Sequence, residues 1–132
     1  MERQIVYNGL KTPDGTIINS VHRHDYVTHE DKNGKHYMID GGLDYVRRSV
    51  NGDEETITIY ADDEFETVRQ YFRWGRNYDK DKNLLPKTEW VILKDITDYH
   101  LDALCIYEKV PKWVTKLFLI EKQFRNILNE LY

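Results

Sequence analysis

The chain has 132 residues, of which 40% are hydrophobic and 32% are charged. This length and composition fit one folded domain with its own core, so we expect a single domain over residues 1–132. The net charge of −4 disfavours a dedicated duplex-DNA binder, because such domains usually carry a basic face. No segment has the layout of a signal peptide or the roughly 20 apolar residues of a membrane span, which predicts an intracellular protein with no membrane partner.

Charge is divided unevenly along the chain. Residues 1–66 contain seven Lys/Arg and fourteen Asp/Glu, whereas residues 67–132 contain twelve and nine. An anionic partner would therefore meet better electrostatics in the C-terminal half, unless arginines of the N-terminal half form a local site. The single cysteine, Cys105, excludes an internal disulfide and is expected to be a buried thiol.

Strands joined by turns are predicted for the first sixty residues. Runs of β-favouring residues alternate there with turn-forming residues at 13–15, 32–35 and 51–53. This pattern predicts an antiparallel meander of four or five strands.

The hydrophobic period changes after residue 60. Asp62 and Asp63 can cap a helix that runs to about Trp74 and stops at Gly75. We expect a solvated polar loop over residues 76–88, which includes Lys80, Lys82 and Lys87. Trp74 and Trp90 are expected to be core anchors rather than stacking platforms, because each has apolar neighbours.

Three further elements complete the predicted fold. Residues 90–93 indicate a buried strand, and Thr97 can cap a short helix that directs Leu101, Leu104 and Cys105 inward. Pro111 begins a final helix that extends to about Leu131. Its apolar residues recur at three- and four-residue spacings and predict one packing face: Trp113, Leu117, Ile120, Phe124, Ile127, Leu128 and Leu131. The predicted fold class is therefore α+β, an antiparallel N-terminal β-meander covered by C-terminal helices.

Four of the five histidines lie within fifteen residues of one another, in a predicted hairpin around Asn33-Gly34. Side chains alternate along a strand, so a turn of two or four residues would fix which of them share a face. One face would carry His22, His24, Tyr26, Thr28, Tyr37 and Ile39, and the other Arg23, Asp25, Val27, His29, His36, Met38 and Asp40.

Two metal-site hypotheses follow from this register. His22-x-His24 has a strand spacing that can bring two imidazoles to one metal, although no third ligand lies nearby in the sequence. Asp25 and Asp40 would lie across the hairpin, where paired carboxylates can hold Mg²⁺ or share a proton. The structural alternative is that the histidines bond to neighbouring groups and that the carboxylates are solvated or paired with arginine.

A candidate anion site follows the hairpin. Asp40-Gly41-Gly42 combines a hydrogen-bond acceptor with two residues that permit close backbone approach, although a plain bend explains it equally well. Arg47 and Arg48 would point to opposite faces of their strand, so at most one can serve a given site. The predicted ligand-binding set is His22, His24, Tyr26, Asp40, Gly41, Gly42, Tyr45, Arg47 and Arg48.

The chain resembles a family of small uncharacterised proteins of large tailed bacteriophages and prophages. The resemblance rests on residues 22–27 (HRHDYV), 39–48 (IDGGLDYVRR), 74–75 (WG) and 93–101 (LKDITDYHL), and it extends over roughly residues 5–131. It implies a phage accessory protein that acts in the cytoplasm of the infected bacterial host, in host takeover or counter-defence. It assigns no catalytic residues and identifies no cofactor.

Three hypotheses of function remain open, and whether the chain is an enzyme stays undecided. The first is a non-catalytic binding module for a small anionic, nucleotide-like ligand. The second is a protein–protein inhibitor whose last helix, with Trp113, Phe118 and Phe124, docks a host bacterial protein or a second copy of the chain. The third is a metal-assisted phosphodiester hydrolase that uses His22, His24, Asp25 or Asp40.

Overall fold

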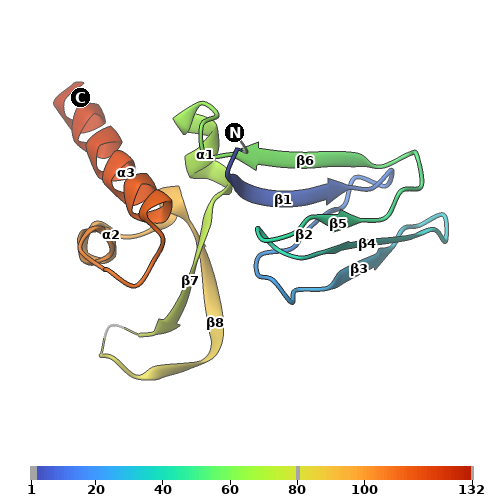
Figure 1. Cartoon of the computed structure of the whole chain (residues 1–132), viewed down its shortest axis with the longest axis horizontal. Coiled ribbons are helices and arrows are strands. Elements are labelled where there is room, and N and C mark those ends of the chain that lie inside the picture. Colours follow the sequence, from blue (N-terminus) through green and yellow to red (C-terminus); the bar gives the residue numbers. More distant parts are fainter. Residues whose placement is uncertain (1–2, 80, 132) are drawn as a thin grey trace. The chain divides into compact units, whose positions relative to one another are not determined.

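Eight antiparallel strands and three α-helices form within the residues that the computed structural model describes, 3–79 and 81–131. This arrangement confirms the predicted α+β class. The chain divides into two units, residues 1–64 and 65–132, which are described in turn (Figure 1). The expectation of a single domain over residues 1–132 stays a prediction.

The first unit contains two three-stranded antiparallel sheets, with strand orders β2-β1-β6 and β3-β4-β5. In chain order the strands are β1 (Ile5–Lys11), β2 (Ile17–Asn19), β3 (Val27–Glu30), β4 (His36–Asp40), β5 (Arg47–Arg48) and β6 (Glu55–Tyr60). Strands β3, β4 and β5 form a meander, whereas β6 returns to pair with β1. The unit therefore has six strands in two sheets rather than the four or five expected.

Apolar side chains from both sheets form the core of the first unit. Leu10, Ile18, Tyr37 and Ile39 make up a buried cluster, and the half-buried Val27 packs against it. These five residues come from β1, β2, β3 and β4. The two sheets thus share one apolar core.

The predicted register of the β3–β4 hairpin is wrong by one residue. Val27 pairs with Ile39 and His29 pairs with Tyr37, so Val27 and His29 share a face with Tyr37 and Ile39. The connection, residues 31–35, contains five residues because the Asp31 carboxylate accepts hydrogen bonds from the backbone N–H groups of Asn33 and Lys35. An odd loop length reverses the facing of every residue on one strand relative to the two- or four-residue turn assumed.

The second unit begins with a helix that is shorter than predicted. Its elements are α1 (Phe65–Tyr71), β7 (Arg73–Tyr78), β8 (Leu84–Ile92), a 3-10 turn η1 (Leu93–Asp95), α2 (Asp98–Cys105) and α3 (Lys112–Leu131). The predicted extension of α1 to Trp74 is wrong, because Trp74 and Gly75 belong to β7. The Phe72 carbonyl accepts a hydrogen bond from the Leu93 N–H, at a donor–acceptor distance of 2.8 Å, and the chain leaves the helix at this point.

A β-hairpin replaces the predicted polar loop of residues 76–88. Strands β7 and β8 pair from Arg73↔Ile92 to Tyr78↔Leu84, and the hairpin extends away from the helices of its unit (Figure 1). Lys82 and Lys87 are exposed as expected, and Lys80 lies outside the described residues. Trp90 is 38% exposed, so residues 90–92 belong to a largely exposed strand and not to a buried one.

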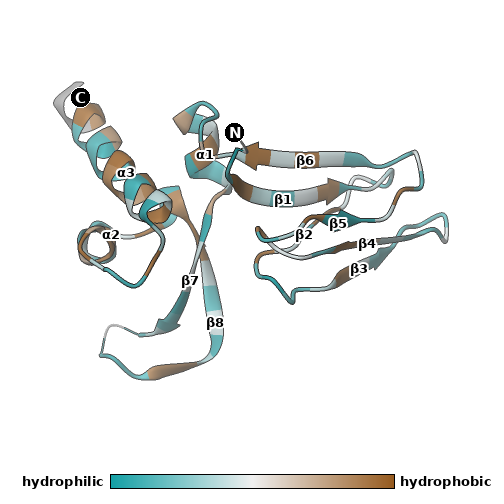
Figure 2. Cartoon of the chain, viewed as in Figure 1, coloured by the Kyte–Doolittle hydropathy of each residue, from teal (hydrophilic) through white to brown (hydrophobic). Residues whose placement is uncertain are grey.

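The predictions for the last two helices are confirmed in their bounds. The Thr97 side chain caps α2 by accepting a hydrogen bond from the His100 N–H, and α2 buries Leu101 and Leu104, while Cys105 is half-buried. Helix α3 begins directly after Pro111. Figure 2 shows hydrophobic and hydrophilic residues alternating along this helix.

The buried face of α3 differs from the predicted face. Val114, Leu117, Phe118 and Glu121 are its buried residues among those described, whereas Trp113, Ile120 and Phe124 are half-buried and Ile127 and Leu128 are exposed. The side chain of Leu131 lies outside the described residues. A three- and four-residue spacing fits either of two neighbouring stripes on the helix surface. The buried stripe is the one that contains Glu121, whose carboxylate forms ion pairs with Arg69 and Arg125.

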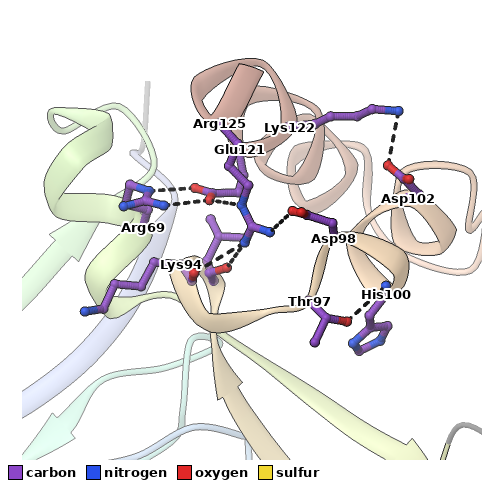
Figure 3. A network of polar contacts seen from close by, with 10 residues as sticks. Arg69, Lys94, Thr97, Asp98, His100, Asp102, Glu121, Lys122 and Arg125 are labelled. Atoms are coloured by element: carbon purple, nitrogen blue, oxygen red, sulfur yellow. Dashed lines mark hydrogen bonds and ion pairs between the residues drawn. The ribbon is translucent and has the colours of Figure 1, made fainter. Parts of the chain in front are cut away.

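Figure 3 shows the polar network that holds this stripe. The carboxylate of Glu121 is fully buried and forms ion pairs with Arg69 of α1, at 2.8 Å, and with Arg125 of α3, at 2.6 Å. Arg125 also donates to Asp98 and to the Leu93 carbonyl. One carboxylate and two guanidinium groups thus connect α1, η1, α2 and α3.

Among residues 3–79 and 81–131, no helix combines the length and apolar content that crossing a bilayer requires.

Candidate ligand-binding pocket

The Asp40-Gly41-Gly42 turn has a structural role in the first unit. Gly41 and Gly42 have φ angles of 91° and 57°, and a Cβ at Gly42 would lie 2.4 Å from the backbone of His22. The Gly41 N–H donates to the Asp40 carboxylate and the Gly42 N–H donates to the Ser20 hydroxyl. Both amides are therefore occupied within the protein.

The buried Asn8 side chain fixes the same turn from β1. Its amide donates to the carbonyl oxygens of Asp40 and Gly42, at 3.2 and 3.0 Å. The turn brings residues 22–26 and 40–47 close together, but through contacts that stabilise the backbone. The structural interpretation of the glycine pair accounts for all of these contacts.

Arg47 and Arg48 have different partners, as their opposite facing on the strand predicts. Arg47 forms an ion pair with Asp40 at 3.0 Å, with a side chain that is 62% exposed. Arg48 is half-buried and donates to the Thr58 hydroxyl of β6, and burial lowers the pKa of its guanidinium. Its Nε is enclosed by protein and has no hydrogen-bond partner, as is also true of the Nε of Arg76 in the second unit.

The remaining predicted site residues lie at the surface. Residues 21–26 form turns and bends rather than a strand, so His22 and His24 do not have the strand spacing assumed for a metal pair. Both histidines are exposed, as are Tyr26 and Tyr45, at 58% and 43%.

Asp25 and the other histidines of this region have partners or lie in solvent. The Asp25 carboxylate accepts from the Val21 N–H and lies 4.0 Å from His22. His29 lies 3.1 Å from the Asp14 carboxylate, and His36 is exposed. Within the described part of the chain, no three His, Cys, Asp or Glu side chains are placed to hold a metal ion.

A pocket of about 320 Å³ lies in the second unit, between β7 and α2. Strand β7 contributes residues 74–78, and α2 with the residues after it contributes His100, Ala103, Leu104 and Tyr107. The indole of Trp74 stands edge-on to the Tyr107 ring, with centroids 6.2 Å apart, and also to the buried Phe118. Contact with α3 through Phe118 thus anchors the aromatic wall.

Two elements of local structure shape this pocket. Gly75 lies opposite Trp90 in the hairpin, and a Cβ at this position would come within 3.0 Å of the Trp90 ring and of the Thr88 methyl group. Glycine therefore lets β8 pack closely against β7. On the other side, the Thr97 cap begins α2 so that His100, Ala103, Leu104 and Tyr107 reach the pocket.

The electrostatics of the pocket favour a negative ligand. Among the described residues that line the pocket, Arg76 is the cationic side chain and none carries a carboxylate. Arg76 forms an ion pair with Glu89 at 3.2 Å, but both side chains are partly exposed, at 33% and 55%, and such pairs contribute little. Burial, and then the charge of Arg76, lower the pKa of His100, which keeps its imidazole neutral at pH 7.

This pocket is not among the sites that the sequence predicts. The sequence predicts a loop for residues 76–78 and a helix end at Trp74-Gly75, and it gives no signal for His100. A signal was present in the alternation of Trp74, Arg76 and Tyr78, which fits one face of a strand. The helix predicted to run from Asp62 and Asp63 to about Trp74 concealed this alternation.

The chain was compared with protein-family models, with curated proteins and with solved structures, and none of them matches.

Proposed function

We propose that the chain is a non-catalytic binding module for a small anionic, nucleotide-like ligand, and that the ligand binds in the pocket between β7 and α2. The observation that carries this proposal is the composition of the described lining residues, which combine aromatic rings with one cation and include no carboxylate. Ligand pockets are typically apolar cavities of about 300–1,000 Å³ with a few polar groups, and this cavity is at the small end of that range.

The second unit also has the more favourable overall charge. Residues 65–132 contain twelve Lys/Arg and ten Asp/Glu, whereas residues 1–64 contain seven and thirteen. The excess of acidic groups in the first unit disfavours an anion near Arg47. We therefore prefer the β7–α2 pocket to the predicted site at residues 22–48.

Amide NMR spectra of isotope-labelled protein titrated with adenosine 5′-monophosphate would test the location. We expect the largest shift changes within residues 74–78 and 100–107, and we expect Arg76→Gln to weaken binding while Arg47→Gln does not. Shift changes centred on residues 22–26 and 40–48 would instead favour the site predicted from sequence. The absence of any saturable change would contradict the proposed function.

The biological setting rests on the resemblance to bacteriophage proteins. A phage accessory protein in the cytoplasm of an infected bacterium meets nucleotides and nucleotide-derived signals, and their capture would serve host takeover or counter-defence. Recovery of the untagged protein from infected cells, followed by native mass spectrometry, would show whether a small anionic compound is bound.

A second candidate function is a protein–protein inhibitor that acts through α3. The residues first considered for it are unsuitable: Phe118 is fully buried, and Trp113 and Phe124 are half-buried against the aromatic rings of Phe72 and Phe65. Leu119 and Ile127 are about half exposed on this helix and provide apolar surface. If α3 binds a host protein or a second copy of the chain, Ile127→Asp should abolish the complex in light scattering and leave ligand binding intact. The metal-assisted hydrolase gains no support from the arrangement of the described side chains.

A further inference from the structure

We propose that Arg76 and His100 form the anion-recognising end of the β7–α2 pocket, and that its ligand is a nucleoside monophosphate whose base contacts Trp74 and Tyr107. This inference deepens the proposed function and rests on it.

The argument begins with the placement of the two basic residues. Arg76 extends from β7 and His100 from the first turn of α2, so they approach the cavity from opposite walls. Both side chains line this one pocket of about 320 Å³, which places them in the same small region of the second unit. A guanidinium presents N–H donors in a fixed fork that matches phosphate oxygens, and an imidazole N–H adds a further donor.

Few competing groups oppose an anion at this end. The other polar side chains among the described lining residues are the hydroxyl groups of Tyr78 and Tyr107 and the amide of Asn77. Glu89 lies opposite Arg76 in the hairpin and pairs with it at 3.2 Å, but its side chain is 55% exposed and it is not one of the residues that line the pocket. A phosphate can therefore share or replace this carboxylate without leaving a buried charge unpaired.

The aromatic residues define the other end of the pocket. Trp74 is held edge-on between Tyr107 and Phe118, so its position is fixed by packing. Tyr107 is 42% exposed and Tyr78 is 58% exposed, which leaves ring surface accessible. Stacking on aromatic rings suits any nucleobase, because every base has a π-face. The cavity volume of about 320 Å³ favours a mononucleotide over a larger nucleotide.

A proton should accompany binding. In the free protein, burial and Arg76 favour the neutral form of His100 by lowering its pKa. A bound phosphate would favour the imidazolium form and raise that pKa, so the complex takes up a proton. Affinity should consequently increase as the pH falls from 7.5 toward the ordinary histidine value of about 6.5.

Calorimetric titration with adenosine 5′-monophosphate and with adenosine tests this proposal. We expect the monophosphate to bind at least about tenfold more tightly than adenosine, which corresponds to one charge-assisted hydrogen bond. Arg76→Gln and His100→Gln should each reduce this preference and leave adenosine binding unchanged. His100→Gln should also abolish the proton uptake, measured in two buffers of different ionisation enthalpy. The comparison is made at pH 7.5, where the phosphate contributes little to the proton count because its second pKa is about 6 and it is already largely the dianion.

Controls separate recognition from folding and from net charge. Lys87→Gln removes one positive charge from an exposed position of β8 outside the pocket and should retain the full preference. Arg76→Lys should retain part of it, because charge is kept but the fork is lost. Equal affinity for the monophosphate and adenosine would overturn the anion end and leave a ring-binding pocket. Failure of both probes to bind would overturn the proposed function together with this inference.

Discussion

Glycine at position 41 is required both by the backbone conformation and by the surrounding atoms. Its φ angle is 91°, and an added Cβ would lie 1.6 Å from the Tyr45 carbonyl oxygen. We expect Gly41→Ala to reduce the free energy of unfolding by about 2–4 kcal/mol, because strain and a backbone clash act together. Chemical denaturation monitored by far-ultraviolet circular dichroism measures this change in the free energy of unfolding.

Gly34 provides the matched control for that substitution. Its φ angle is 82°, but an added Cβ meets no atom within 4 Å. Gly34→Ala should therefore cost only about 1 kcal/mol, from backbone strain alone. Equal losses for the two variants would show that the contact with Tyr45 relaxes without cost.

Glu121 is the second residue whose replacement should reduce stability by a predictable amount. It is fully buried between Arg69 and Arg125, whose side chains are only 18% and 16% exposed. Glu121→Gln leaves both guanidinium groups without the charge they pair with, and we expect a loss of about 3–5 kcal/mol. Asp102→Asn removes a carboxylate from the exposed pair with Lys122 and should change stability by no more than about 0.5 kcal/mol. A small effect of Glu121→Gln would mean that other contacts hold the helices together.

At the scale of elements, the capped helix α2 allows a direct test of local structure. The Thr97 hydroxyl accepts from the His100 N–H at 3.2 Å, and α2 has only eight residues, so one cap supports a large part of it. Thr97→Ala should reduce stability by about 1 kcal/mol, and Thr97→Ser should restore most of this loss. Because His100 lines the pocket, faster amide exchange in α2 and weaker ligand binding should accompany the change.

Local signals predicted the helices of the C-terminal part well. Thr97 and Pro111 lie where the sequence placed the starts of α2 and α3, because caps and proline act within one turn of the helix. The buried stripe of α3 was not predictable in the same way. It includes Glu121, whose burial depends on Arg69, 52 residues earlier in the chain.

Nonlocal pairing explains the error at β7, and a side-chain contact within the loop explains the error in the β3–β4 hairpin. The sequence around Trp74 and Gly75 predicts a helix end. In the structure these residues pair with Val91 and Trp90, some fifteen residues later in the chain, and therefore form a strand. In the hairpin, a single carboxylate, Asp31, sets a five-residue loop and so inverts the facing of the histidines. The candidate pocket was missed because it depends on the first of these pairings.

At the scale of the whole molecule, the first unit has the features of a fragment that folds alone. The buried cluster of Leu10, Ile18, Tyr37 and Ile39 lies within it, and its first and last strands pair along their length. Arg3 forms ion pairs with Asp62 and Asp63 and lies 4.1 Å above the Tyr60 ring, which ties together the two ends of the unit. All of these contacts remain when the chain is ended at residue 64.

We therefore expect a fragment of residues 1–64 to give a dispersed amide NMR spectrum and a cooperative unfolding transition, with a free energy of unfolding of roughly 3–5 kcal/mol or less. A chain of this size buries only about 60% of the surface exposed in its unfolded state, so its stability should be small. Arg3→Ala should lower that stability by no more than about 1 kcal/mol, because its two ion pairs are largely exposed. A fragment that stays unfolded would show that the first unit needs residues 65–132 in order to fold. This outcome would support the prediction of one domain over the whole chain. In that case a ligand bound in the second unit would also stabilise the first, whereas independent units would respond to it separately.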